Sequence, residues 1–211
     1  MCIRDRITPR NLSEQPNNQP FSHILFAGAA RTDKGFLHVI ALLEHMSQKQ
    51  FSIPVVIQTS PDHYGKYDDK TRDGFRRMQK MNYPALRTCP QVLDSRSYRE
   101  LFHGAISLQL YSRQDFTDRI SGVTLDALSA GSPVVTLSGT WIARVVAEFT
   151  AGIVLDSPEP DQVLGAISAI LGQFDTYQQN ALRAGRELQQ RHNAGHLMRE
   201  LTAQNLQVAS L

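Results

Sequence analysis

The sequence predicts an α/β protein built on a doubly wound parallel sheet. Five short apolar runs recur along the chain, and most of them lack the strict alternation of a half-exposed strand. Stretches with helical spacing of apolar residues separate these runs, and the links between them are short. Continuous apolar runs suit parallel strands that are covered on both faces, and strand–helix alternation favours a doubly wound sheet. The five runs are 23–29, 53–60, 105–112, 132–138 and 151–157.

Six helices are expected between and after these strands. In the first of them, apolar residues recur at helical spacing from Phe36 to Met46. A sixth run, residues 86–93, contains Pro90 and would lie at a sheet edge if it is a strand. The expected helices span 35–49, 69–82, 95–103, 122–130, 140–149 and 159–172.

The composition describes an ordinary globular chain. Of its 211 residues, 41% are hydrophobic and 20% are charged, and the net charge is +2. This charge is too small to indicate a nucleic-acid partner. The basic residues Arg76, Arg77 and Lys80 are interpreted as a solvated helix face. No run approaches the length of a transmembrane segment, and the two cysteines, Cys2 and Cys89, form no motif and favour a reducing compartment.

The chain divides into three parts. Residues 1–6 look like a non-biological start, and residues 7–20 are polar and proline-containing, as in a linker. Residues 21–173 form the expected domain, and residues 174–211 form a polar helical tail. This tail either packs on its own domain or crosses to another one.

The most informative stretch runs from Asp118 to Trp141. Ser121 is a good helix N-cap, and Gly122 and Val123 would offer free N–H groups to an anion. Asp126 would lie about one turn further into the same helix, and Gly131 would end it. This layout suits a diphosphate joined to a hydroxylated sugar.

The loop after the first strand reads GAARTDKGF and offers two cations, Arg31 and Lys34. It is neither a Walker A loop nor a GxGxxG loop. Fixed cations at the carboxyl end of a strand can neutralise a leaving diphosphate. The alternative is that both side chains face solvent at the start of the next helix.

These two stretches resemble the donor-binding signature of retaining glycosyltransferases of family 4, which have the GT-B fold. The family has two Glu separated by seven residues and then G-x-P-V-V, where this chain has Asp118, Asp126 and GSPVV. Its loop G-R-x-x-x-E-K-G places the Lys in register with Lys34, whereas Ala29 stands at the position of the family's Arg.

The resemblance implies a Rossmann-like domain, the C-terminal half of a GT-B enzyme. Lys34 and Arg31 would bind the diphosphate, assisted by the N–H groups of residues 121–123. Asp126 would accept hydrogen bonds from the ribose, and Asp118 would contact the sugar. The reaction implied is hexose transfer with retention, without a metal or another cofactor beyond the nucleotide-sugar donor. Lys34 and Asp118 are the candidate catalytic residues.

The resemblance also implies a partner: an N-terminal acceptor-binding domain that this chain lacks. The fragment would then bind its donor without turnover. We expect a cytoplasmic location, with peripheral association with the inner membrane as an open alternative. The rival functions are a GT-B sugar-nucleotide epimerase and a non-catalytic α/β module.

Several other residues are weaker candidates. Gln58 and Thr59 end a strand on the ligand side, and Trp141 is either a packing residue or a platform for a base. His192 and His196 have the spacing of a helical metal site, but Gly195 interrupts that helix.

Overall fold

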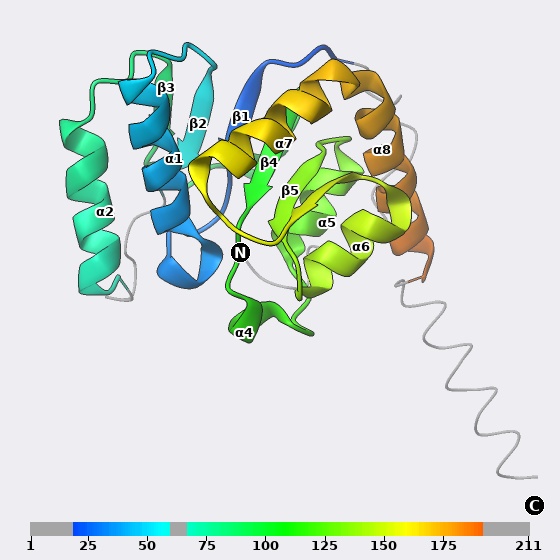
Figure 1. Ribbon diagram of the computed structural model, residues 1–211. Helices are drawn as coiled ribbons and strands as arrows, with labels where there is room; N and C mark the ends of the chain where they lie inside the picture. Colours follow the sequence, from blue (N-terminus) through cyan, green and yellow to red (C-terminus); the bar gives the residue numbers. More distant parts are fainter. Residues whose placement is uncertain (1–18, 60–66, 192–211) are drawn as a thin grey trace, which may run out of the picture.

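A six-stranded parallel sheet forms the centre of the molecule (Figure 1). The computed structural model describes residues 19–59 and 67–191. The strand order is β3-β2-β1-β4-β5-β6, the order of Rossmann-type sheets, so the predicted fold class is confirmed. The strands are β1 (His23–Phe26), β2 (Val55–Gln58), β3 (Leu86–Cys89), β4 (Ala105–Gln109), β5 (Val134–Leu137) and β6 (Gly152–Leu155).

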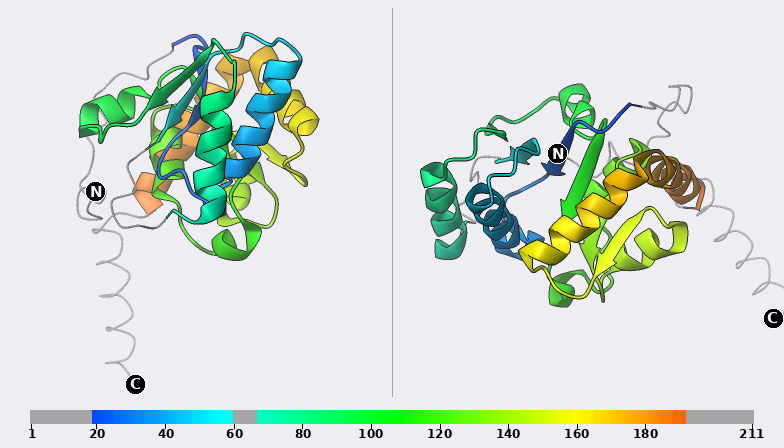
Figure 2. Two further views of the ribbon diagram at one scale, coloured as in Figure 1. Left: turned by 90° about the vertical axis from the view of Figure 1, so that its left-hand side faces the viewer. Right: turned by 45° about the horizontal axis from the view of Figure 1, so that its top comes forward.

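Helices cover both faces of this sheet (Figure 2). One face packs against α1 (Phe36–Gln48), α2 (Asp69–Lys80) and α7 (Pro160–Gly172). The other packs against α3 (Ser95–Glu100), α5 (Gly122–Ser129), α6 (Trp141–Phe149) and α8 (Phe174–Arg191). In β1, Ile24 and Phe26 belong to the first core and Leu25 belongs to the second. Burial on both faces explains why the strand sequences do not alternate.

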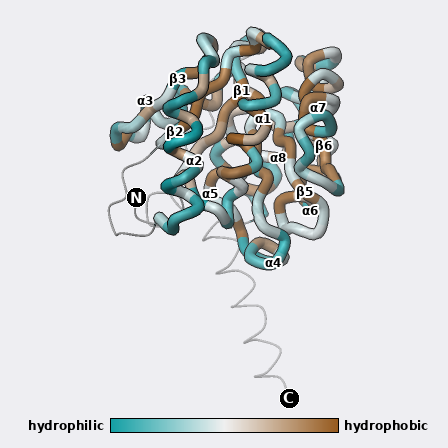
Figure 3. The backbone as a smooth tube through the Cα atoms, turned by 60° about the vertical axis from the view of Figure 1, so that its left-hand side comes forward, coloured by the Kyte–Doolittle hydropathy of each residue, from teal (hydrophilic) through white to brown (hydrophobic). Residues whose placement is uncertain are grey.

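The strands and long helices match the sequence-based expectations closely. The run with Pro90 forms the outer strand β3, as predicted for an edge. The predicted basic face of α2 is also observed, since Arg76 pairs with Asp73 and Arg77 with Glu44 at the surface. Figure 3 shows the hydrophilic character of this helix. Two short elements were not predicted: the 3-10 turn η2 (Thr32–Lys34) and helix α4 (Arg113–Phe116).

The sheet changes winding direction between β1 and β4, because β1 leads outward to β2 while β4 leads to β5. The segments that follow β1 and β4 meet at the carboxyl edge, where α4 lies at the bottom of Figure 1. The backbone N–H of Ser112 donates to the carbonyl oxygen of Asp33 at 2.9 Å. Gly35 has φ +77°, and a Cβ there would lie 2.1 Å from the carbonyl oxygen of Leu110. Only glycine permits this approach.

Helix α8 packs on the same domain. It buries Ala181, Ala184 and Leu188 in the core shared with α5 and α6. A Cβ on Gly185 would lie 2.7 Å from the backbone of Ser129, so α5 and α8 touch through their main chains. Of the two placements considered for the tail, its described part therefore adopts the first; residues 192–211 lie outside the described residues. None of the described helices is long and apolar enough to cross a membrane.

Replacing Gly35 with Ala should lower the free energy of unfolding by more than about 2 kcal/mol, because a left-handed backbone and a main-chain overlap are both imposed. Urea denaturation of the purified protein measures this change. The control is Gly165→Ala in α7, where nothing lies within 4 Å of the new Cβ. The Gly165→Ala change should raise the free energy of unfolding by about 0.5–1 kcal/mol. Equal stability of the two variants would contradict the close approach at Gly35.

Candidate functional site

Three segments meet around Lys34 at the carboxyl edge of the sheet. Lys34 ends the η2 turn after β1, and its Nζ lies 5.8 Å from the ring centroid of Tyr111, which follows β4. A methyl group placed on Gly28 would lie 3.3 Å from this Nζ and 3.2 Å from Val123 Cγ2 in helix α5. The predicted residues Lys34 and Val123 are therefore close neighbours across the point where the sheet changes winding direction.

The start of helix α5 has the cap that the sequence predicted. Ser121 is the N-cap, and its Oγ accepts a hydrogen bond from the N–H of Thr124 at 3.3 Å. The N–H groups of Gly122 and Val123 donate to no group among the described residues. Unpaired N–H groups at the positive end of a helix dipole attract anions. The Lys34 ammonium adds a full positive charge on the same side.

Two buried polar side chains support this edge. The Gly28 N–H donates to Gln58 Oε1 at 2.7 Å, which holds the loop after β1 against β2. Gln58, considered above as a residue on the ligand side of a strand, is 7% exposed and holds that loop in place. Tyr111 is buried against Phe116, with ring centroids 4.6 Å apart. Burial raises the pKa of Tyr111, so the phenol beneath Lys34 stays neutral.

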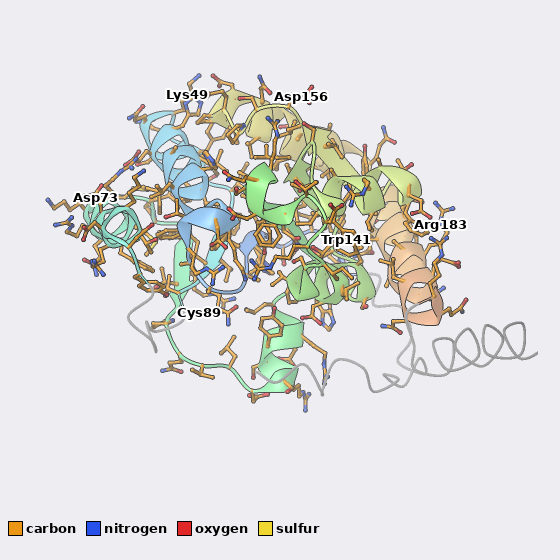
Figure 4. All side chains as sticks on the ribbon, turned by 90° about the horizontal axis from the view of Figure 1, so that it is seen from below. Lys49, Asp73, Cys89, Trp141, Asp156 and Arg183 are labelled. Carbon is orange, nitrogen blue, oxygen red and sulfur yellow. The ribbon has the colours of Figure 1, made fainter. Side chains whose placement is uncertain are left out.

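Asp126 lies one turn inside α5 and is 3% exposed. Its position matches the sequence prediction, and its carboxylate is among the buried polar groups of this helix. Trp141 is the first residue of α6 and packs partly buried against the neighbouring core. Figure 4 views the molecule from the carboxyl edge and labels this side chain.

Arg31 is the N-cap residue of the η2 turn, and it bonds Asp33 within that turn. Its Nε donates to Asp33 Oδ1 at 2.8 Å, and its Nη2 donates to Asp33 Oδ2. The pair lies on an open pocket of about 410 Å³. The residues around this pocket are all polar: Arg31, Thr32, Asp33, Asp68, Thr71, Ser112 and Asp115. Lys34 and Ser121 do not line it.

Asp118 is a surface residue that pairs with helix α6. Its side chain is 85% exposed, and its Oδ1 accepts a hydrogen bond at 2.8 Å from Nη2 of Arg144 in helix α6. It does not line the pocket that contains Arg31. The structure therefore brings Lys34 to the start of α5, keeps Arg31 with Asp33, and pairs Asp118 with α6.

No hydrogen-bonding role was expected for Arg113 from the sequence. In the structure, its guanidinium connects the segments that follow three strands. Its Nε donates to the carbonyl oxygen of Ser138 at 2.9 Å, and its Nη2 donates to Ser138 Oγ at 3.1 Å. Nη2 also donates to the carbonyl oxygen of Asp156. The loops after β4, β5 and β6 are thus fixed relative to one another. An arginine within four residues of the end of a buried strand was the available signal.

No group of three or more potential metal ligands occurs in residues 19–59 and 67–191. His192 and His196 lie outside the described residues. Cys89 is a partly exposed free thiol at the edge strand.

These features define a Rossmann-like domain with an anion-attracting edge at the change of winding direction.

Among solved structures, sucrose-phosphate synthase from Thermosynechococcus elongatus matches with a TM-score of 0.65 at 18% identity, over 92% of this chain and 47% of that one. The C-terminal domain of a group 1 glycosyl transferase from Francisella tularensis matches with a TM-score of 0.61 at 12% identity, over 90% of this chain and 97% of that domain.

A trehalose-6-phosphate structure from E. coli, bound with UDP-2-fluoro glucose, matches with a TM-score of 0.59 at 14% identity, over 90% of this chain and 44% of that one. The chain thus has the fold of the C-terminal domain of GT-B glycosyltransferases, as predicted. It spans about half the length of sucrose-phosphate synthase. No protein-family model and no curated protein matches the sequence.

Replacing Asp118 with Asn, or Arg144 with Gln, should change the free energy of unfolding by less than about 1 kcal/mol, because exposed ion pairs contribute little. A double-mutant cycle measured by urea denaturation should give a coupling energy below about 1 kcal/mol. A coupling energy above about 2 kcal/mol would show that the ion pair stabilises the fold. Asp118 would then no longer be a candidate for contacting a ligand.

Proposed function

We propose that this chain is the donor-binding domain of a glycosyltransferase and that it binds a nucleotide-diphosphate sugar. The observation that carries the proposal is the meeting of Lys34 with the start of α5. An ammonium group beside Gly28 and Val123, next to two N–H groups at a helix start, is a site for a diphosphate.

The fold supports the same assignment. In doubly wound sheets, ligands bind beyond the carboxyl ends of the strands where the winding changes, which is the edge that holds Lys34 and Ser121. One solved structure of the same fold was determined with UDP-2-fluoro glucose bound. The diphosphate would lie between Lys34 and the N–H groups of Gly122 and Val123.

The remaining roles follow from the resemblance described above. Asp126 would accept hydrogen bonds from the ribose, Asp118 would leave Arg144 to contact the sugar, and Arg31 would join the diphosphate. The reaction would be hexose transfer with retention to an acceptor held by a second domain. The resemblance also implies that the chain alone binds the donor without turnover.

Replacing Lys34 with Ala should weaken UDP or GDP binding by about 10- to 150-fold, because a charge-assisted contact worth about 1.5–3 kcal/mol is lost. Calorimetric titration with both diphosphates and with the matching nucleosides measures the effect. The control is Lys49→Ala at the opposite end of α1, which should bind like the wild type. If the folded Lys34→Ala protein binds every diphosphate as well as the wild type, the phosphate site is wrong.

Replacing Asp126 with Asn should weaken nucleosides and nucleoside diphosphates alike, because the ribose loses a charged acceptor worth about 1.5–3 kcal/mol. Lys34→Ala, by contrast, should leave nucleoside binding unchanged. The same titrations compare the two variants. An Asp126→Asn protein that binds uridine and guanosine normally would place the ribose elsewhere.

A further inference from the structure

The guanidinium of Arg31 already binds the carboxylate of Asp33. Its Nε and Nη2 both donate to Asp33, so the bidentate edge of the guanidinium is used. The hydrogen bond that Arg31 donates to Asp33 is also the main reason that the pKa of Arg31 is raised. The side chains of Arg31 and Asp33 are 29% and 25% exposed, so the pair is partly shielded from water. A phosphate group would seek this same edge, because it also accepts two parallel N–H donors.

The surroundings hold Asp33 in place. Its carbonyl oxygen accepts a hydrogen bond from the N–H of Ser112 at 2.9 Å, which fixes its backbone against the segment after β4. Asp115 lines the same pocket and adds a second negative charge that acts on Arg31. The positive charge of Arg31 is therefore offset by two carboxylates, whereas Lys34 lies beside Gly28 and the start of α5.

We propose that Asp33 is an internal competitor of phosphate for Arg31, and that this competition sets the affinity of the domain for its donor. The carboxylate of Asp33 occupies the guanidinium edge until a diphosphate displaces it, and each phosphate oxygen then replaces one carboxylate oxygen. The inference rests on the proposed function, because it assumes that a diphosphate binds at this edge.

The test compares diphosphate affinity in matched variants. Wild type, Asp33→Asn and the double variant Arg31→Ala/Asp33→Asn are titrated calorimetrically with UDP and with inorganic pyrophosphate, which carries no base. Asp33→Asn should bind both probes about 5- to 20-fold more tightly, because Arg31 becomes available. The double variant should lose this gain and return to within about 3-fold of the wild type.

The control for a general change of charge is Asp175→Asn, an exposed position in the first turn of α8. It removes the same charge away from Arg31 and should leave both affinities unchanged. A gain in Asp33→Asn that persists in the double variant, or that Asp175→Asn reproduces, would overturn the inference. So would an Asp33→Asn protein that binds no more tightly than the wild type.

A measurement on the unaltered protein covers the case in which Asp33→Asn fails to fold. The Nε–H resonance of Arg31, assigned with Arg31→Lys, should shift in step with pyrophosphate binding as the carboxylate is exchanged for phosphate. A resonance that stays in place at saturation would overturn the inference while leaving the proposed function intact. If the wild type binds no diphosphate, the proposed function itself fails.

Discussion

The close approach of Gly35 to the carbonyl group of Leu110 is the constraint on which the arrangement around Lys34 and Asp33 depends. It brings the turn after β1 against the exit of β4, and the hydrogen bond from Ser112 to Asp33 fixes the two segments in register. Because η2 has only three residues, its side chains leave in different directions within a short distance. Lys34 turns towards Gly28 and α5, while Asp33 turns towards Arg31. One short turn thus carries both Lys34 and the bonding partner of Arg31.

Much of the fold could be predicted from local sequence. Strands buried on both faces leave continuous apolar runs, and Ser121 and Thr140 are polar caps directly before apolar helices. These signals are contained within a few neighbouring residues. The short elements η2 and α4 give no such signal, because a single turn has too few residues to show a period.

The pairing of charges could not be predicted in the same way. The sequence shows that Arg31, Lys34 and Asp118 are charged and that each follows a strand. It does not show that Arg31 bonds Asp33, or that Asp118 accepts a hydrogen bond from Arg144 in α6. Long polar side chains bond to partners that the tertiary fold brings near. Arg113 is the clearest case, since its acceptors lie 25 and 43 residues away in the sequence.

The main-chain contact between Gly185 and Ser129 joins helix α8 directly to the helix whose start carries the candidate anion site. Because no side chain separates the two helices at this point, any group larger than hydrogen at position 185 would push α5 and α8 apart. The free N–H groups of Gly122 and Val123 lie at the far end of α5 from Ser129. The spacing between α5 and α8 therefore bears on the position of the whole of α5, including the end that presents its N–H groups to an anion.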